Sequence, residues 1–146
     1  MNNRELQIIA HKVRRHALTA VHSAGSGHPG GSLSISEILT LLYFEEMKNL
    51  DPKDPNAPNR DRFVLSKGHC SPALYGVLAE RGFFSTDLIC KFRQADCCLQ
   101  GHPSLKDVPG VDMSSGSLGQ GVSAANGMAL AAKVDGASYR EYVVTG

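Results

Sequence analysis

The sequence predicts an α/β fold in which helices cover both faces of a parallel sheet. Two short runs have the composition of buried strands, residues 60–66 and residues 142–145. Longer segments before and between these runs carry apolar residues at every third or fourth position, which is the period of a helix. Because strands separated by a helix can pair in parallel, both runs are expected in one sheet.

The chain has the size and composition of one folded domain. Its 146 residues are enough for a hydrophobic core and indicate no second domain. The formal net charge is +1, which indicates neither a polyanion-binding surface nor an acidic tail, so nucleic acid is not an expected partner. No apolar run reaches membrane-spanning length, and the N-terminus lacks the apolar region of a signal peptide. We therefore expect a cytoplasmic protein without a membrane partner.

The cysteines are expected to be reduced thiols. Cys70, Cys90, Cys97 and Cys98 follow no C-x-x-C pattern, and the adjacent pair is poorly placed to form a disulfide with itself. A zinc site made by Cys90, Cys97, Cys98 and His102 is an alternative. Its spacing matches no familiar zinc finger or ribbon, so it is disfavoured.

Residues 3–22 have the pattern of an amphipathic helix, with basic residues between the apolar ones. The helix should stop at Gly25, since glycine readily takes the left-handed conformation that ends helices. His11 and His16 lie on this helix. Both are expected to be solvated or capping residues rather than catalytic ones.

Residues 23–32 are predicted to form a loop, because four glycines and one proline fall within this segment. Ser34 and Glu37 then have the spacing of a capping box, so a second helix should start there and run to about Lys48. Three prolines indicate that residues 49–59 cross the surface without regular structure.

The first strand run ends just before Gly68 and His69, where the chain passes into a predicted helix at residues 71–81. Ligands of open α/β sheets bind at such carboxyl ends of strands. The helix should end at Gly82, and a shorter helix is predicted at residues 85–93.

The C-terminal part of the sequence contains a long segment without a helix or strand pattern, residues 94–117. A connection of that length inside a compact domain is usually functional. A helix at residues 119–134 and the strand at 142–145 follow it. Because two strands make a thin sheet, we expect the fold to be incomplete at its C-terminal end.

Histidines are the main candidates for chemistry. His28, His69 and His102 each lie on a separate loop with a glycine neighbour, which leaves the ring accessible. Imidazole exchanges protons near neutral pH, so three such rings can form one set of acids and bases. A lone loop histidine is more often a plain surface residue, but the repetition favours function.

A glycine-rich turn, Ser114 to Gly121, opens the last predicted helix. Its glycines let another group approach the backbone, and the N–H groups at the start of a helix suit an anion or a carbonyl-like acceptor. The alternative is that the glycines only let the helix pack tightly on its neighbour. The histidine at 102 shortly before the turn favours a ligand site.

Four ordered motifs carry a family resemblance. They are Ser26-Gly27-His28-Pro29-Gly30, residues 61–69 (DRFVLSKGH), Gly101-His102-Pro103 and residues 116–121 (GSLGQG). Together they resemble the N-terminal part of transketolase, in the style of the N-terminal subunit of split, two-chain transketolases. The resemblance spans nearly the whole chain, and implies that residues 1–146 are the N-terminal portion of a diphosphate-binding domain with the thiamine-diphosphate-binding fold.

The resemblance implies an activity and a cofactor. Enzymes of this family use thiamine diphosphate to transfer a two-carbon ketol unit between sugar phosphates, as in the pentose phosphate pathway. It implies that His28 and His102 bind the substrate and take part in catalysis. It also implies that the cofactor contacts His69, Gly116, Ser117 and Leu118.

The same resemblance implies groups that this sequence does not hold. In the family, an aspartate after the glycine matching Gly146 and a later asparagine bind Mg²⁺ or Ca²⁺, so no metal ligand is expected among residues 1–146. A glutamate that activates the cofactor lies in the other half of the enzyme, across a dimer interface. We therefore expect an oligomer with a complementary C-terminal half or subunit, and no activity without it.

Alternatives remain open at this stage. Dihydroxyacetone synthase shares the cofactor and the fold, whereas 1-deoxyxylulose-5-phosphate synthase fits the motif around His102 less well. The alternative outside the enzymes is that the chain acts as a non-catalytic fragment, or as a pseudo-subunit that docks on a thiamine-diphosphate enzyme.

Overall fold

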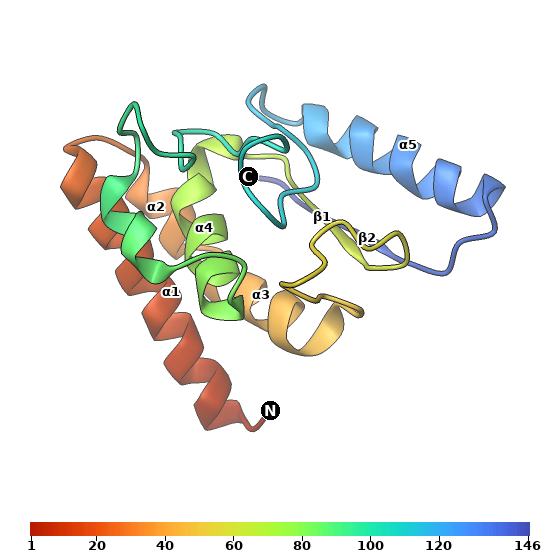
Figure 1. Cartoon of the computed structure of the whole chain (residues 1–146), viewed down its shortest axis with the longest axis horizontal. Coiled ribbons are helices and arrows are strands. Elements are labelled where there is room, and N and C mark those ends of the chain that lie inside the picture. Colours follow the sequence, from red (N-terminus) through yellow and green to blue (C-terminus); the bar gives the residue numbers. More distant parts are fainter.

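The structure, a computed structural model, describes all 146 residues and shows a parallel sheet between helices (Figure 1). Strand β1 (Arg62–Leu65) pairs in parallel with β2 (Glu141–Val144), so that Arg62 lies opposite Glu141. The helix α5 (Gln120–Val134) packs on one face of the strands, and the remaining helices lie on the opposite side. The predicted α/β arrangement is confirmed.

Strand β1 is buried on both faces, because its side chains alternate between the main core and α5. Phe63 and Leu65 belong to the main hydrophobic core, whereas Val64 lies close to Gly121 at the start of α5. All three β1 side chains are at most 2% exposed. A strand with this burial needs an almost continuous apolar sequence, which is why the run was recognisable.

The N-terminal helix α1 (Asn3–Ala24) matches the predicted segment and ends at Gly25 with φ 61°. Its first turn holds a capping box that was not predicted: the Asn2 side chain accepts from the Glu5 amide, and the Glu5 carboxylate accepts from the Asn2 amide at 2.9 Å.

The capping box predicted at Ser34 and Glu37 is wrong. Ser34 follows a short helix, α2 (Pro29–Leu33), and its hydroxyl donates to the Gly31 carbonyl at 2.9 Å. The predicted loop at 23–32 therefore contains the start of a helix, with proline in its first turn where no intrahelical N–H is needed.

The next helix, α3 (Ser36–Leu41), continues into a π-helical turn (Leu42–Glu46) rather than an α-helix to Lys48. The helix predicted at 85–93 is a shorter 3₁₀ turn (Thr86–Lys91). These differences concern the type of helical turn, which the spacing of apolar residues over a short segment does not distinguish.

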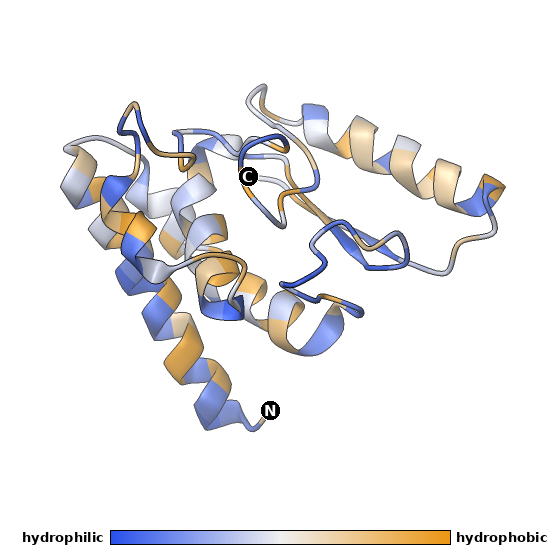
Figure 2. Ribbon diagram, viewed as in Figure 1, coloured by the Kyte–Doolittle hydropathy of each residue, from blue (hydrophilic) through white to orange (hydrophobic).

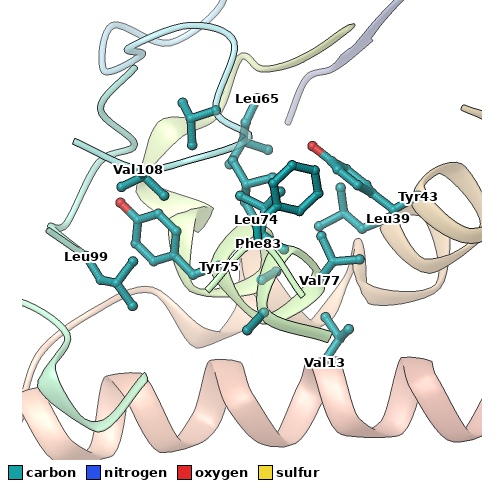
Figure 3. Packing of buried hydrophobic residues seen from close by; sticks show 14 of the residues in the cluster. Val13, Leu39, Tyr43, Leu65, Leu74, Tyr75, Val77, Phe83, Leu99 and Val108 are labelled. Carbon is teal, nitrogen blue, oxygen red and sulfur yellow. The ribbon is translucent and has the colours of Figure 1, made fainter. Parts of the chain in front are cut away.

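Helix α4 (Ser71–Arg81) runs through the centre of the molecule and follows a 3₁₀ turn (Gly68–Cys70). It ends at Gly82, as predicted. Figure 3 shows its core contacts with α1, α3, β1 and the long connection, made by residues that include Val13, Leu39, Leu65, Leu74, Tyr75, Val77, Leu99 and Val108. Residues 94–117 thus pack on the core although they form no regular element.

Hydrophilic and hydrophobic residues alternate around α1, whereas α5 carries fewer hydrophilic ones (Figure 2). Among the exposed large apolar residues, Leu130 and Val134 of α5 are 63% and 79% exposed. No helix combines the length and the apolar character that crossing a membrane requires.

His16 is neither solvated nor a capping residue, which corrects the sequence-based expectation. It is buried where α1 meets α4, and its Nε2 lies 2.7 Å from the Glu80 carboxylate. Lys12 also donates to Glu80, at 3.1 Å. Burial is the largest single influence on the pKa of the Glu80 carboxyl and raises it. The hydrogen bonds from His16 and Lys12, with the charges of these residues, together outweigh burial, so the pKa is lowered overall.

A buried ion pair joins the long connection to the start of β1. Arg60 and Asp112 form a two-pronged salt bridge, and the second Asp112 oxygen accepts from the Phe63 amide at 2.8 Å. The Arg60 side chain also donates to the Pro55 and Asp61 carbonyls. The guanidinium is therefore satisfied, and the segment around Asp112 has a fixed place beside the strand.

Replacing Asp112 with Ala should destabilise the chain by about 3–5 kcal/mol, because it leaves the buried Arg60 charge without a counter-charge. Asp112→Asn should cost less, since its side-chain oxygen can still accept from Phe63. Urea unfolding measures both, with Asp54→Ala on the surface as the matched control. A loss from Asp112→Ala no larger than that of the control would contradict the role assigned to the ion pair.

Candidate functional site

The predicted site residues gather around the carboxyl end of β1. Ser66 accepts from the Gly119 amide at 3.2 Å, which fixes the start of α5 against the end of the strand. Ser115, near the end of the long connection, packs directly against Gly68, and Gly146 lies against the Lys67 side chain. Three segments far apart in sequence therefore converge where β1 ends.

His28 and His69 are in contact. Their ring centroids are 5.0 Å apart, and the planes make an angle of 72°, an edge-to-face arrangement. His28 immediately precedes α2, and His69 lies in the 3₁₀ turn between β1 and α4. His28 is exposed and His69 is partly buried, so the more accessible of the two rings is that of His28.

His102 lies on the same side of the molecule, and its ring is next to Gly116. The Tyr75 hydroxyl of α4 donates to the His102 carbonyl at 3.1 Å, which holds this part of the connection on the core. His102 is also close enough for its charge to affect His69. The structure thus brings the three loop histidines together; their chemical roles stay predictions.

The pKa of His69 is lowered from its ordinary value of 6.5. Burial is the first cause, because it disfavours the charged imidazolium. The positive charges of His28, Lys67 and His102 lower the pKa further. His69 is therefore neutral at neutral pH and can both donate and accept one hydrogen bond.

Lys67 is a site residue that sequence reasoning missed. It directly follows Ser66, is only 5% exposed, and its ammonium has one hydrogen-bond partner, the Ser34 hydroxyl at 3.4 Å. A buried ammonium ordinarily needs a carboxylate or several acceptors. The charge of Lys67 is thus available to an anion that enters beside it.

Three buried hydroxyls in the segments that surround Lys67 also lack partners: Ser66 precedes it, Ser115 packs on Gly68, and Ser32 lies two residues before Ser34. The oxygens of Ser32, Ser66 and Ser115 are shielded from solvent and make no hydrogen bond within the chain. Buried polar groups in native proteins are almost always paired, so these hydroxyls can each accept or donate a bond to a ligand or a water molecule. Serine is too common for this signal to be visible in the sequence.

The start of α5 differs from the expectation of free N–H groups. The amides of Gly119, Gln120 and Val122 donate to the Ser66, Ser117 and Gly119 carbonyls, respectively. They are not free for an anion. A side chain at position 121 would have its Cβ 2.8 Å from a Val64 methyl carbon, so this glycine serves close packing of α5 on β1.

Gly116, Ser117 and Leu118 are all exposed, and Leu118 is 67% exposed. They form the surface of the turn that begins beside His102. Nothing within the chain covers this apolar side chain, and its proposed contact with a cofactor stays a prediction.

The zinc alternative is not supported. Among all residues of the chain, no group of three or more His, Cys, Asp or Glu side chains is arranged to hold a metal ion. Cys90, Cys97 and Cys98 are free thiols, of which Cys97 is buried in the core.

Together, these features fit an anionic cofactor better than a metal ion. The buried Lys67 ammonium and the unpaired hydroxyls of Ser32, Ser66 and Ser115 suit the oxygens of a diphosphate. Ionised carboxylates, which hard cations require, are absent from this group.

Comparison with known proteins identifies relatives of the whole chain. The family model for the transketolase, thiamine diphosphate binding domain matches residues 6–144. The chain is 46% identical over 142 residues to the 6-deoxy-6-sulfo-D-fructose transketolase subunit SqwG of Clostridium sp. (strain MSTE9). It is 43% identical over 141 residues to one of the subunits of the apulose-4-phosphate transketolase of Phocaeicola vulgatus. Each match covers 97% of this chain, but only 51% and 50% of the respective subunits.

Full-length transketolases match in the same way. Human transketolase is 44% identical over 142 residues, which are 22% of its length. The structure of Campylobacter jejuni transketolase superposes with a TM-score of 0.92 and 36% identity, covering 100% of this chain and 24% of that one. The Pichia stipitis enzyme in complex with sedoheptulose 7-phosphate superposes with a TM-score of 0.91. The chain spans about half the length of the subunits and about a fifth to a quarter of these full-length enzymes.

Replacing His28 with Gln should raise the pKa of His69 towards its ordinary value of 6.5 without reaching it, because burial, the larger cause, remains. In the unaltered chain, the lowered pKa means that the unfolded state binds the proton more readily than the folded state. His69 therefore contributes stability above about pH 6.5 that is lost as the pH falls.

NMR titration of the histidine ring protons measures this pKa, with His11→Gln on the exposed side of α1 as the matched control. A His69 pKa of 6.5 or above in the unaltered chain would contradict the described environment.

Proposed function

Since the chain belongs to the transketolase family through its thiamine diphosphate-binding domain, we propose a role in binding the cofactor's diphosphate. In this proposal, the chain is the N-terminal portion of the diphosphate-binding half of a transketolase. The observation that carries this proposal is the Lys67 ammonium, which is buried without a counter-charge beside three converging histidines. A buried cation with only a hydroxyl partner is costly unless an anion binds there, and the cofactor carries a diphosphate.

Lys67 and the neighbouring serine hydroxyls would hold this diphosphate. His69, which is neutral because of its lowered pKa, would donate one hydrogen bond to a cofactor oxygen without adding charge. Gly116, Ser117 and Leu118 would line the remainder of the cofactor, with the exposed Leu118 packing beside its thiazolium ring. When bound, thiamine diphosphate supplies the nucleophilic carbon and the electron sink for ketol transfer.

His28 and His102 would serve the substrate. Both are exposed on the side where the loops converge, so their ring nitrogens can reach a sugar that lies over the cofactor. Imidazole can hydrogen-bond a sugar hydroxyl and take or return its proton near neutral pH. Their placement on separate loops allows the two rings to contact different hydroxyl groups of one ketose.

The substrates and partners of the assembled enzyme are part of the proposal. We propose sugar phosphates as substrates, with a role in the pentose phosphate pathway; the relatives' names include apulose 4-phosphate and a sulfofructose, so the sugar varies within the family. We also propose a complementary C-terminal half, a dimer, and Mg²⁺ or Ca²⁺ bound by ligands outside residues 1–146. The four free cysteines are consistent with a reducing, cytoplasmic location.

The 146-residue chain alone should bind thiamine diphosphate weakly and without dependence on Mg²⁺, because no metal ligands are present in its site. Lys67→Met should weaken the binding by about tenfold, the value of one charge-assisted contact of roughly 1.4 kcal/mol. Isothermal titration calorimetry with thiamine diphosphate and with thiamine measures both effects.

Two comparisons make this test specific. Thiamine lacks the diphosphate, so its binding should not change in Lys67→Met, and Lys53→Met at an exposed position should change neither ligand. Tight Mg²⁺-dependent binding would contradict the placement of the metal ligands elsewhere. Equal affinity of Lys67→Met and the unaltered chain for thiamine diphosphate would contradict the role of Lys67.

In the assembled enzyme, His102→Ala should lower turnover of a ketose phosphate donor by about 10²-fold or more, the usual contribution of a positioned acid or base. The fold should remain intact, because the ring is exposed and the connection is held through the backbone carbonyl. Coupled kinetic assays and thermal unfolding measure the two effects, with His11→Ala as the control. Unchanged turnover would refute a catalytic role for His102.

A further inference from the structure

Arg93 connects two of the loops that carry the histidines, although no role has yet been assigned to it. Its Nη1 donates to the Ser26 hydroxyl at 2.9 Å, two residues before His28. The same guanidinium packs against Gly101, which directly precedes His102. One side chain therefore touches both segments whose rings are proposed to meet the substrate.

The backbone at Arg93 is held in an unusual conformation. Its φ is 65°, in the left-handed region, and only one other non-glycine residue of the chain, Asn49, has a positive φ. The Arg93 amide donates to the Leu99 carbonyl at 2.8 Å, and the preceding Phe92 is 1% exposed in the core. Such a conformation is costly for a residue with a Cβ atom, so the surroundings must determine it. This conformation fixes the point from which the arginine side chain leaves the core.

The Arg93 guanidinium occupies the space that a side chain at Gly101 would need, so such a side chain would displace it. A Cβ atom at this position would lie 2.8 Å from Arg93 Nη2 and 2.9 Å from Nε. Nε is also shielded from solvent and has no hydrogen-bond partner, which costs free energy. The position of the guanidinium is therefore not explained by its own hydrogen bonding alone. It is consistent with a requirement for close contact with the backbone before His102.

The opposite side of this segment is fixed by α4. The Ser71 hydroxyl donates to the Gly101 carbonyl at 3.0 Å, and the Tyr75 hydroxyl donates to the Gln100 and His102 carbonyls. The carbonyl groups thus bind the core, while Arg93 packs on the glycine and bonds to the loop that leads to His28. The guanidinium therefore connects the segment before His28 with the segment before His102.

We propose that Arg93 is a positioning residue that sets the placement of His28 relative to His102. The proposal rests on the proposed function, because the placement matters only if both rings act on one substrate. Arg93 itself does not touch the reacting atoms in this proposal. Displacement of a catalytic group by about 1 Å can lower a rate by 10²-fold, so a loosened connection has a measurable effect.

The first test does not depend on activity. Arg93→Met keeps an apolar side chain but removes the guanidinium, including its contact over the Phe92 ring. Arg15→Met, at an exposed arginine on α1, is the matched control. In the 146-residue chain, hydrogen exchange at residues 23–31 and at residues 99–103 should become at least about threefold faster in Arg93→Met. The control Arg15→Met should leave both segments unchanged. Ser26→Ala removes only the acceptor, so it should accelerate exchange at 23–31 even if Arg93→Met does not fold.

The second test uses the assembled enzyme. Arg93→Met should lower kcat/KM for the ketose donor by about tenfold or more. Arg93→Lys should recover part of this loss, because an ammonium can still donate to Ser26, although it cannot reproduce the planar contact with Gly101. Stability measured by urea unfolding should change too little to account for the loss.

Three results would overturn the proposal. The first is unchanged hydrogen exchange in both segments of Arg93→Met, and the second is a kcat/KM of Arg93→Met within twofold of the unaltered enzyme. The third is an equal loss of kcat/KM in Arg93→Met and Arg93→Lys that is explained by their loss of stability in urea. Absence of turnover in the unaltered assembled enzyme would instead refute the proposed function. The exchange experiment would then still report whether Arg93 couples the two loops.

Discussion

A buried positive charge at each end of β1 is the constraint on which the placement of the strand and of the candidate site depends. At the start of the strand, the Arg60 guanidinium is neutralised by Asp112 and satisfied by two backbone carbonyls. At the other end, the Lys67 ammonium is equally buried but has only the hydroxyl of Ser34. Desolvation penalises both cations, yet only the first has a counter-charge within the chain. The first therefore serves the fold, whereas the second is a stability cost that an anionic ligand would offset.

Regular elements were predictable from the sequence where burial creates a periodic pattern. The nearly continuous apolar run of β1 and the stop signals at Gly25 and Gly82 reflect local chemistry, and the structure agrees with them. The capping box at Ser34 failed because the preceding residues already form a helix, which depends on packing against the core. His16 was misjudged because its partner, Glu80, lies 64 positions away in the sequence. Such non-local pairing leaves no periodic signal.

The site was predictable to the same limited extent. His28, His69 and His102 stand out because their glycine neighbours form recognisable motifs, and the structure brings them together. Lys67 lies inside the 61–69 motif without being marked there as a site residue, and Arg93 lies outside all four motifs. Lysine and arginine are usually solvated, so neither residue type indicates burial. Their importance follows from burial and from contacts with distant loops. The family resemblance identified the domain, but it did not indicate which charges the fold leaves unpaired.

The glycines beside the histidines have a physical role beyond exposure of the ring. The Arg93 guanidinium occupies the space where a Cβ atom at Gly101 would lie, so a side chain at this position would displace it. The glycine and the arginine therefore act as one unit: the missing side chain admits the guanidinium, and the guanidinium reaches Ser26 on the other loop. The position of His102 then depends on a residue outside its own motif. A chain that kept the three histidines but lost this contact would preserve the motif without the geometry that we propose catalysis requires.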